Sequence, residues 1–345
     1  MPAERFFLSS FVYQTGPYAG MKGLQSQCQA CMDSRRQELQ AENPMPYKLQ
    51  QLVANCLQRV NRYVNGEPRN PALPMLPMDI DAQWAGDRAA QLQGRSQMTG
   101  VPFVINRLCD WKLSMNQKVS GLGYTRGPNG DDGNAELFVY EENVNGITDA
   151  AGNNVQVREG DWTLLFRTTL DYLTAAADSE AQRIIEAATA AQLALLARMA
   201  ANGQLRRLAK RHVDSANYQD RFAKPQRSTA NNITVEEAMQ KLLDQQGRCF
   251  YSFMVLVLAT HSFWQLSLER INNALPHTNA NTVWVVRVLN CTGNAQAEGG
   301  VGISPAKWGY WLKNQTLVQL TQFQIDAVDA YLSRSPAAVA AMMLA

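Results

Sequence analysis

The pattern of apolar and polar positions is dominated by one stretch, Cys249 to Leu268, which carries no charged residue. Its apolar residues recur mostly at helical spacing, which predicts a helix that continues to about Ala274. The stretch is long enough to cross a membrane. Its scattered serine, threonine, histidine and glutamine residues favour a buried core helix instead. Because a helix that is apolar nearly all round must be wrapped by other elements, we expect it at the centre of the fold.

The residues before this stretch contain a strong signal for the start of a helix. Thr234 and Glu237 have the spacing of a capping box, in which each side chain satisfies a free backbone amide of the other residue. Gly247 leaves two interpretations open. Either one helix continues from Val235 through Cys249, or a first helix ends near Gln246 and a second begins at Cys249.

Helical periodicity also predicts further elements on both sides of the central stretch. These helices are expected at 21–41, 46–64, 79–93 and 168–212, and from Ser304 to about Leu332. The helix at 46–64 has an apolar stripe of Leu49, Leu52, Val53, Cys56, Leu57 and Val60, and Asp79 is the predicted cap of the next helix. Asn202–Gly203 predicts a break in the fourth helix, and a polar loop is expected at 214–232.

Short runs of β-branched and aromatic residues predict a smaller β portion. They lie at 136–140, 155–157, 162–166 and 282–289, the last almost wholly apolar, whereas 101–118 fits strand or helix. The predicted fold class is therefore α+β: predominantly α-helical, with a central buried helix and a small, mostly antiparallel β portion. The proline-rich residues 66–78 predict a connector between an N-terminal arm and helical hairpin at 1–65 and a main α+β domain at 79–345. A single domain is the alternative.

Composition narrows the function classes only slightly. The chain has 345 residues, of which 18% are charged, and a net charge of +2, so any contact with nucleic acid must be local. Its six cysteines are scattered, which is typical of reduced thiols rather than of a disulfide scaffold. The N-terminus lacks the cationic and long apolar regions of a signal peptide. We therefore expect the protein in the cytoplasm or in an assembled particle, without membrane contact.

Cys249 is the first candidate for chemistry. If it opens a helix, the positive end of the helix dipole lowers the pKa of its thiol and makes it a better nucleophile. His277, just before the predicted strand, is a candidate base, and Gln246 a candidate donor to an oxyanion. This layout is similar to that of papain-like cysteine hydrolases, although the local sequence lacks their signature. The alternative is that Cys249 is a small buried apolar residue.

A second candidate is a basic patch formed by Arg206, Arg207, Lys210 and Arg211. These residues are expected on one side of a helix end, where they can contact phosphates without sequence preference. The alternative is a solvated helix C-terminus, because the helix dipole alone favours cations there.

Other motifs are too incomplete to predict a metal or a cofactor. Cys28 and Cys31 have the spacing of a zinc or redox pair but lack two further ligands, so chance spacing on a helix is favoured. Acidic and amide residues at 131–136 lack a full calcium-loop pattern, and the glycines at 293–302 lack the phosphate-loop lysine.

Two function classes remain. The first is a structural protein that self-associates into a homo-oligomer, of the shell, filament or injection-apparatus type found in viral or phage-like particles, and contacts nucleic acid through the basic patch. The apolar C-terminal tail and the extended N-terminal arm favour it, because such segments commonly become buried on a neighbouring subunit. The second is an effector-type cysteine hydrolase or transferase that uses Cys249 and His277. We favour the first, since loose motif matches have a high false-positive rate.

Overall fold

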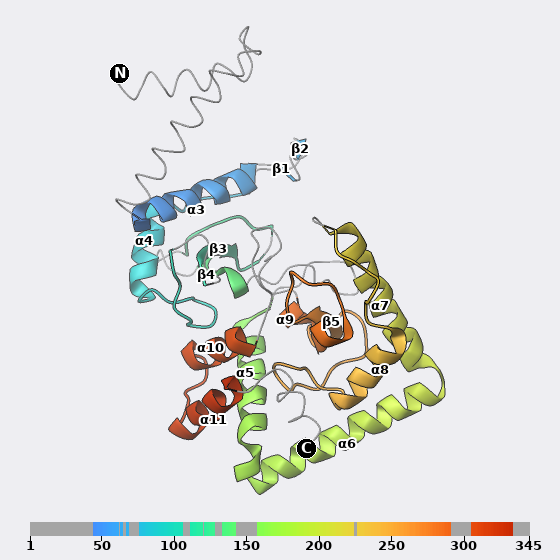
Figure 1. Ribbon diagram of the computed structural model, residues 1–345. Coiled ribbons are helices and arrows are strands. Elements are labelled where there is room, and N and C mark those ends of the chain that lie inside the picture. Colours follow the sequence, from blue (N-terminus) through green and yellow to red (C-terminus); the bar gives the residue numbers. More distant parts are fainter. Residues whose placement is uncertain are drawn as a thin grey trace. The chain divides into compact units, whose positions relative to one another are not determined.

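The computed structural model describes residues 44–61, 63–64, 67–68, 76–105, 111–119, 121–127, 133–142, 157–223, 226–290 and 305–333. These residues form an α+β fold that is predominantly helical, with short antiparallel strand pairs, as the sequence predicts (Figure 1). The chain divides into two compact units, with the boundary between Asp87 and Arg88. The predicted helix at 21–41 and the elements beyond Leu332 lie outside the described residues.

The N-terminal unit is organised by helix α3, Pro44–Asn61. Its buried side chains are Leu49, Leu52, Cys56 and Val60, which confirms the apolar stripe predicted there. Two short antiparallel strands follow, β1 (Tyr63–Val64) and β2 (Glu67–Pro68). Helix α4 spans Ala82–Gln91. Asp79 was expected to cap it, but the carboxylate of Asp81 accepts a hydrogen bond from the backbone amide of Trp84 at 2.7 Å and takes this role.

The larger unit begins with an antiparallel strand pair. Strand β3, Leu113–Gln117, pairs with β4, Ala135–Val139, so that Leu113 lies opposite Val139. Every residue of β4 is buried, and the short 3-10 helix η1 (Tyr140–Glu142) follows it. The strand predicted at 136–140 is thus confirmed to within one residue, and the ambiguous region 101–118 provides its partner.

Helices form the rest of this unit's frame. They are α5 (Glu159–Thr174), the 3-10 turn η2 (Ala175–Ala177), α6 (Ser179–Ala201), α7 (Gln204–Phe222), α8 (Val235–Asp244), α10 (Pro305–Asn314) and α11 (Gln322–Leu332). The Asp178 carboxylate accepts hydrogen bonds from the backbone amides of Glu180 and Ala181 at the start of α6. The predicted capping box of Thr234 and Glu237 is present at the start of α8.

Three of the predicted elements differ from the structure. Residues 162–166 were expected to form a strand but belong to α5, because Trp162, Leu165, Phe166, Thr169 and Leu170 bury one face at helical spacing. The polar loop expected from residue 214 starts only after Phe222, where α7 ends. The final helical segment is interrupted between Asn314 and Gln322, where α10 turns into α11.

The apolar stretch at the centre of the sequence is buried near both of its ends, whereas Ala259, Thr260 and His261 are exposed, and the helix predicted for Cys249 to Ala274 is wrong. Helix α8 ends at Asp244, and Gln246 and Gly247 adopt left-handed φ angles of 54° and 68°, which no helix can continue. Residues 248–265 form turns held by isolated bridges, Arg248 to Val255 and Val257 to Gln265. Strand β5, Leu266–Arg270, follows.

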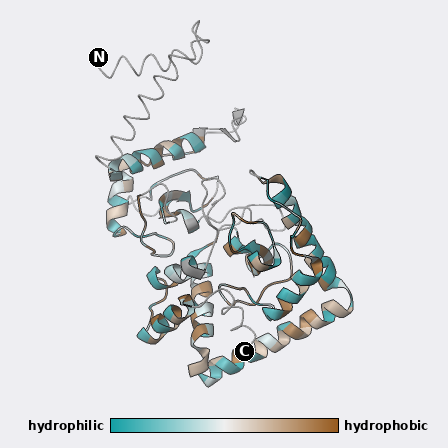
Figure 2. Ribbon diagram, viewed as in Figure 1, coloured by the Kyte–Doolittle hydropathy of each residue, from teal (hydrophilic) through white to brown (hydrophobic). Residues whose placement is uncertain are grey.

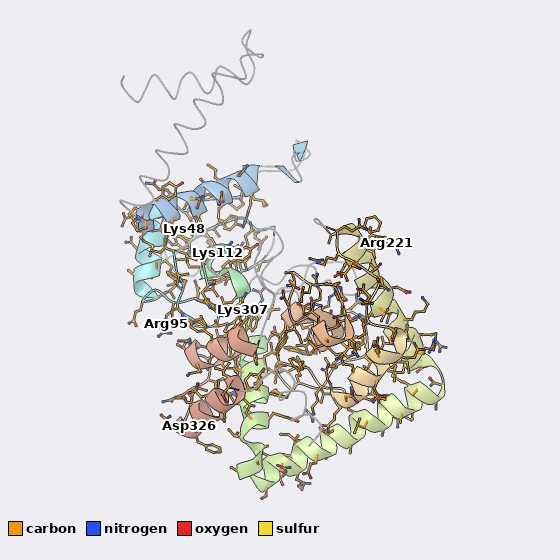
Figure 3. All side chains as sticks on the ribbon, in the orientation of Figure 1. Lys48, Arg95, Lys112, Arg221, Lys307 and Asp326 are labelled. Atoms are coloured by element: carbon orange, nitrogen blue, oxygen red, sulfur yellow. The ribbon has the colours of Figure 1, made fainter. Side chains whose placement is uncertain are left out.

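Strand β5 pairs antiparallel with β6, Thr282–Val286, which the 3-10 turn η3 (Asn279–Asn281) precedes. All five residues of β6 are buried, so this part of the strand predicted at 282–289 is confirmed. The chain then turns into the short helix α9, Arg287–Asn290, rather than extending the strand. Figure 3 shows the side chains that crowd around β5 and α9.

Aromatic side chains complete the core of the larger unit. The rings of Trp162 and Trp311 lie 4.5 Å apart between centroids, and those of Phe166 and Trp308 lie 5.5 Å apart, so α5 packs against α10. Tyr172 and Phe253 stack at 4.2 Å and join α5 to the apolar stretch. This core gives α6 and α7 a fixed support, on which the candidate site lies.

Candidate functional site

The basic patch lies in the first two turns of α7. Gly203 has a left-handed φ of 71° and separates α6 from α7, which confirms the break predicted at Asn202–Gly203. Because α7 then continues to Phe222, Arg206, Arg207, Lys210 and Arg211 lie near its N-terminus and not at a helix C-terminus. The helix dipole therefore does not favour these cations, and the alternative explanation of the patch as a favourable C-terminal cluster is wrong.

The four cations form two rows along α7. In the first row, Arg206 forms an ion pair with Glu236 of α8, and Lys210 contacts Asp214 one turn further along α7, at 2.7 Å. All four of these side chains are exposed. Both cations of the first row are therefore paired with nearby acidic residues.

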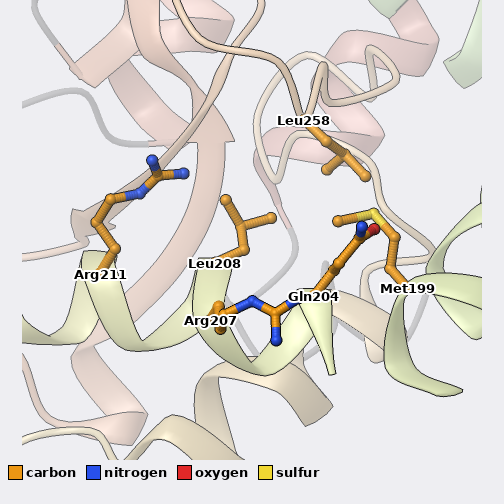
Figure 4. A pocket seen from close by; sticks show the side chains of 6 residues that line it. All are labelled: Met199, Gln204, Arg207, Leu208, Arg211 and Leu258. Atoms are coloured by element: carbon orange, nitrogen blue, oxygen red, sulfur yellow. The ribbon is translucent and has the colours of Figure 1, made fainter. Parts of the chain in front are cut away.

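The second row consists of Arg207 and Arg211, which form no ion pair within the described part of the chain. Both line an open hollow with a volume of about 390 Å³. Figure 4 shows them on successive turns of α7, with Leu208 between them and Leu258 on the opposite side. Met199, from the end of α6, and Gln204 complete the lining.

The charge near this hollow is positive. His212, next to Arg211 in sequence, does not add to it, because burial, together with the neighbouring Arg211 and Arg287, lowers the pKa of its imidazole to about 4. At neutral pH His212 is therefore uncharged, and its ring meets the edge of Trp284 at 5.2 Å between centroids. No acidic residue lies in the first turn of α7 to offset the two arginines. The hollow thus combines unneutralised cations with an apolar wall.

The sequence predicted Arg207 and Arg211 but not the rest of this lining. Gln204 lies three residues before Arg207, and Leu208 lies four residues after Gln204 and three before Arg211, so helical spacing alone could have placed both in the lining. Nothing in the sequence indicates Leu258, which the irregular chain after α8 brings to α7 from a distance. The separation into a paired and an unpaired row depends on Glu236, which belongs to another helix.

Cys249 does not open a helix. It lies in the turn after Arg248, its backbone amide donates to the carbonyl of Met254 at 2.8 Å, and its side chain is fully buried. Burial raises the pKa of the Cys249 thiol, and hydrogen bonds with Ser252 offset this only in part. No helix in the described part of the chain begins at Cys249, so the condition for activating its thiol in this way is not met.

His277 is buried against Asp220 of α7. Both its backbone amide, at 2.8 Å, and its Nδ1, at 2.9 Å, contact the same carboxylate oxygen. Burial lowers the pKa of the His277 imidazole, so it is neutral and donates from Nδ1 to the Asp220 carboxylate. The contacts of His277 and those of Cys249 involve different residues.

The candidate oxyanion donor Gln246 is only partly buried and has a left-handed backbone. The side chain of its neighbour Gln245 is used in structural hydrogen bonds. Its amide nitrogen donates to the carbonyls of Arg248 and Trp284, and its amide oxygen accepts from the backbone amide of Trp284. The described contacts therefore do not join Cys249, His277 and Gln246 into one constellation.

The remaining motifs lie largely outside the described residues, which include neither Cys28 and Cys31, nor Asp131 and Asp132, nor the glycines at 293–302. Among the residues that the structure describes, no group of three or more histidine, cysteine, aspartate or glutamate side chains is placed to hold a metal ion.

Comparisons with protein-family models, with curated proteins and with solved structures give no match to this chain. The functional argument therefore depends on the chemistry of its own surfaces.

Proposed function

We propose that the protein is a structural protein that self-associates into a homo-oligomer and contacts nucleic acid through the unpaired row of its basic patch, Arg207 and Arg211. The observation that supports self-association is the exposure of α6. Of its 23 residues, only Gln192 and Leu196 are buried. Figure 2 shows apolar colours along the middle of this helix.

The exposed residues of α6 have the spacing of a helix-pairing surface. Alternate steps of four and three residues give one row, and every member of it is exposed: Glu180, Ile184, Ala187, Ala191, Ala194 and Arg198. This 3.5-residue repeat is the pattern by which two helices pack along a common seam. The three alanines at the centre allow the two backbones to approach closely.

The charges at the two ends of this row favour a second copy of the same chain as the partner. In an antiparallel pair related by a two-fold axis, Glu180 lies opposite Arg198 of the partner subunit, and Ala187 lies opposite Ala191 of the partner subunit. The same glutamate–arginine contact then forms twice, as a self-complementary interface requires. Within the described residues, Arg198 has no ion pair of its own, whereas Glu180 contacts Arg183 of its own helix at 2.6 Å, an exposed pair that contributes little and that the partner's Arg198 would share or replace.

A membrane is the competing environment for α6. By length and composition alone, α6 is apolar enough to span one, with a mean hydropathy of 1.4 over its best window. Glu180, Arg183 and Glu186 occupy its first two turns, however, and the charge-free part extends only over residues 187–197. That is about half of the roughly 20 residues that a spanning helix needs, so we favour another protein subunit.

The decisive test is the absolute mass of the purified full-length protein, measured by light scattering across a range of concentrations. We expect multiples of the 38.4 kDa chain. A monomer at every concentration would refute self-association. A protein that stays soluble only in detergent would support the membrane instead.

The contact with nucleic acid is proposed for Arg207 and Arg211 alone, because Arg206 and Lys210 already pair with acidic residues. It is tested on the same sample by the ratio of absorbance at 260 and 280 nm before and after a high-salt wash. Phosphate contacts weaken steeply with salt, so nucleic acid that co-purifies should be released by the wash.

A further inference from the structure

The hollow beside α7 has two chemically different walls. One, on α7, carries the guanidinium groups of Arg207 and Arg211 with the apolar Leu208 between them, and the other is formed by Leu258 and by Met199 at the end of α6 (Figure 4). A ligand that uses both walls must carry an anionic group next to a flat or apolar one. Inorganic phosphate satisfies only the first wall, and a plain hydrocarbon only the second.

We propose that this hollow binds single-stranded nucleic acid, with phosphates on Arg207 and Arg211 and one unstacked base against Leu208 and Leu258. An arginine side chain can donate two parallel hydrogen bonds to a phosphate, which suits it to this contact. A base in a single strand is free to turn out of its stack, whereas a duplex keeps its bases inside and offers mainly its phosphates. The apolar wall therefore selects the single strand.

The position of the two arginines supports a bound anion. Arg207 lies at the end of the first turn of α7, where a cation opposes the helix dipole, whereas Arg211 lies one turn further on, where the dipole has little effect. A phosphate at the same end of α7 reverses the sign of that effect, because helix N-termini favour negative charge. Local rules of helix design are commonly broken at functional positions, and here a phosphate compensates.

Binding at this hollow rests on the proposed contact with nucleic acid, and it is independent of self-association through α6. Binding at the hollow and a general phosphate contact differ in what they require of α7. A general phosphate contact needs only the positive charge, whereas the hollow also needs the apolar wall and a base.

The test is fluorescence anisotropy with three labelled 12-mers on the full-length protein: oligo-dT, an abasic strand of equal charge, and a duplex. We expect oligo-dT to bind about threefold more tightly than the abasic strand, a smaller gain than stacking on an aromatic ring would give, because the base meets only the apolar side chains of Leu208 and Leu258. An oligo-U strand should bind similarly, because none of the lining residues is assigned to a sugar hydroxyl.

The neighbouring row of cations provides a matched control. The double variant Arg207→Ala/Arg211→Ala should lose at least about tenfold in affinity for oligo-dT, as expected for removed charge-assisted hydrogen bonds. The variant Arg206→Ala/Lys210→Ala removes the same net charge from the same two turns, yet should bind nearly as the unaltered protein does. Circular dichroism checks that both variants keep their helices.

The apolar wall is tested with Leu258→Gln, which should reduce affinity for oligo-dT without changing the dependence of affinity on salt. If the three 12-mers bind equally, or the duplex binds best, the base site is wrong while a general phosphate contact survives. If both double variants lose affinity equally, the hollow is not the site. If no oligonucleotide binds, the contact with nucleic acid is wrong as well, and the mass measurement still reports on self-association.

Discussion

The side-chain amide of Gln192 donates from Nε2 to the backbone carbonyl of Leu256 across 3.0 Å. Gln192 is one of the two buried residues of α6, and Leu256 belongs to the irregular apolar stretch. The same nitrogen lies 3.5 Å from the carbonyl oxygen of Gly247. One glutamine thus holds α6 against two points of this segment, which are themselves joined by a hydrogen bond from the backbone amide of Leu256 to the carbonyl of Gly247 at 2.9 Å.

Replacing Gly247 with alanine should disrupt this junction. Gly247 has a φ of 68°, and a Cβ there would lie 2.5 Å from Cγ of Gln192. We expect a loss of roughly 2–4 kcal/mol in the free energy of unfolding, from backbone strain and overpacking together. Gly94→Ala is the control, since its φ of 72° is similar but no atom lies within 4 Å of the added Cβ. Urea denaturation should show the smaller loss for Gly94→Ala, and equal losses would contradict the packing argument.

The apolar stretch also shows where sequence patterns are ambiguous. Its burial could be predicted, because a charge-free run of that length must be covered. Its local structure could not, because a run that is apolar at nearly every position fits a buried helix, a strand or a packed irregular segment equally well. The structure is decided by left-handed φ angles at Gln246, Gly247, Phe253 and His261, of which only the glycine is visible as a signal.

Predictions based on local chemistry succeeded more often. The capping box of Thr234 and Glu237, the stripe of α3 and the strand at β6 each depend on residues close together in sequence. Residues 162–166 failed because five residues are too few to separate the period of a strand from that of a helix. The composition of the candidate site was partly predictable as a basic patch, but its hollow depends on Leu258, which only the tertiary fold brings to α7.

A buried carboxylate, Asp220, should contribute strongly to stability. It accepts hydrogen bonds from His277 and from Asn232, and Arg227 and Arg270 lie 3.5 and 3.7 Å from its other oxygen. Asp220→Asn removes the charge that these cations face, and we expect a loss of roughly 3–5 kcal/mol, as for other broken buried pairs. Asp214→Asn, on the exposed face of the same helix, should change the midpoint of urea denaturation little.

The pKa of Asp220 predicts how its contribution to stability changes with pH. Burial raises the pKa of its carboxyl, but the hydrogen bonds and the charge of its surroundings outweigh burial and hold the pKa below the ordinary value of 3.8. The stabilisation is therefore present at neutral pH and is lost as the pH falls through the folded-state pKa. Asp220→Asn should lack this acid-dependent loss, and an unchanged acid profile in the variant would contradict the assignment.

Glu142 should have the opposite effect on stability. Its side chain is buried with hydrogen bonds to Ser96 and Thr99, and burial raises the pKa of its carboxyl from 4.5 to about 8. Between these values the folded protein retains a proton that the unfolded chain has released. Stability should therefore fall with rising pH, by up to about 1.4 kcal/mol per pH unit from this group.

Glu142→Gln removes the titrating group while keeping its shape. Urea denaturation at pH 5 and at pH 8 should show a smaller difference for this variant than for the unaltered protein. The exposed Glu186→Gln serves as the control and should leave the difference unchanged. Glu269 is also buried, and burial raises the pKa of its carboxyl to about 8. It adds a similar fall of stability with rising pH, which neither variant removes.

Cys249 should be inert in the folded protein. Its thiol is buried and burial raises its pKa, so the thiolate that reacts with iodoacetamide is scarce at neutral pH. Mass spectrometry after brief labelling should find Cys249 unmodified, and find it modified once guanidinium has unfolded the chain. Cys56, which is also buried, is the internal comparison. Rapid labelling of Cys249 in the folded protein, slowed by His277→Ala, would instead favour the cysteine hydrolase.

The charged ends of the α6 row provide the sharpest test of how copies associate. In the antiparallel pair, Glu180→Arg places two arginines together at each end, and Arg198→Glu places two glutamates together. Each single reversal should weaken association, because like charges repel across the seam. The double reversal Glu180→Arg/Arg198→Glu restores opposite charges and should recover the mass measured by light scattering.

A second pair of variants separates the seam from the rest of the helix. Ala191→Glu puts a carboxylate at the centre of the row, where it would be buried and unpaired, and should give monomers. Ala200→Glu changes an exposed alanine on a side of α6 that faces away from the row and should leave the mass unchanged. If neither reversal nor Ala191→Glu alters the mass of an oligomer, the copies associate through another surface. If the double reversal fails to rescue association, the partners are not arranged antiparallel with Glu180 facing Arg198 of the partner subunit.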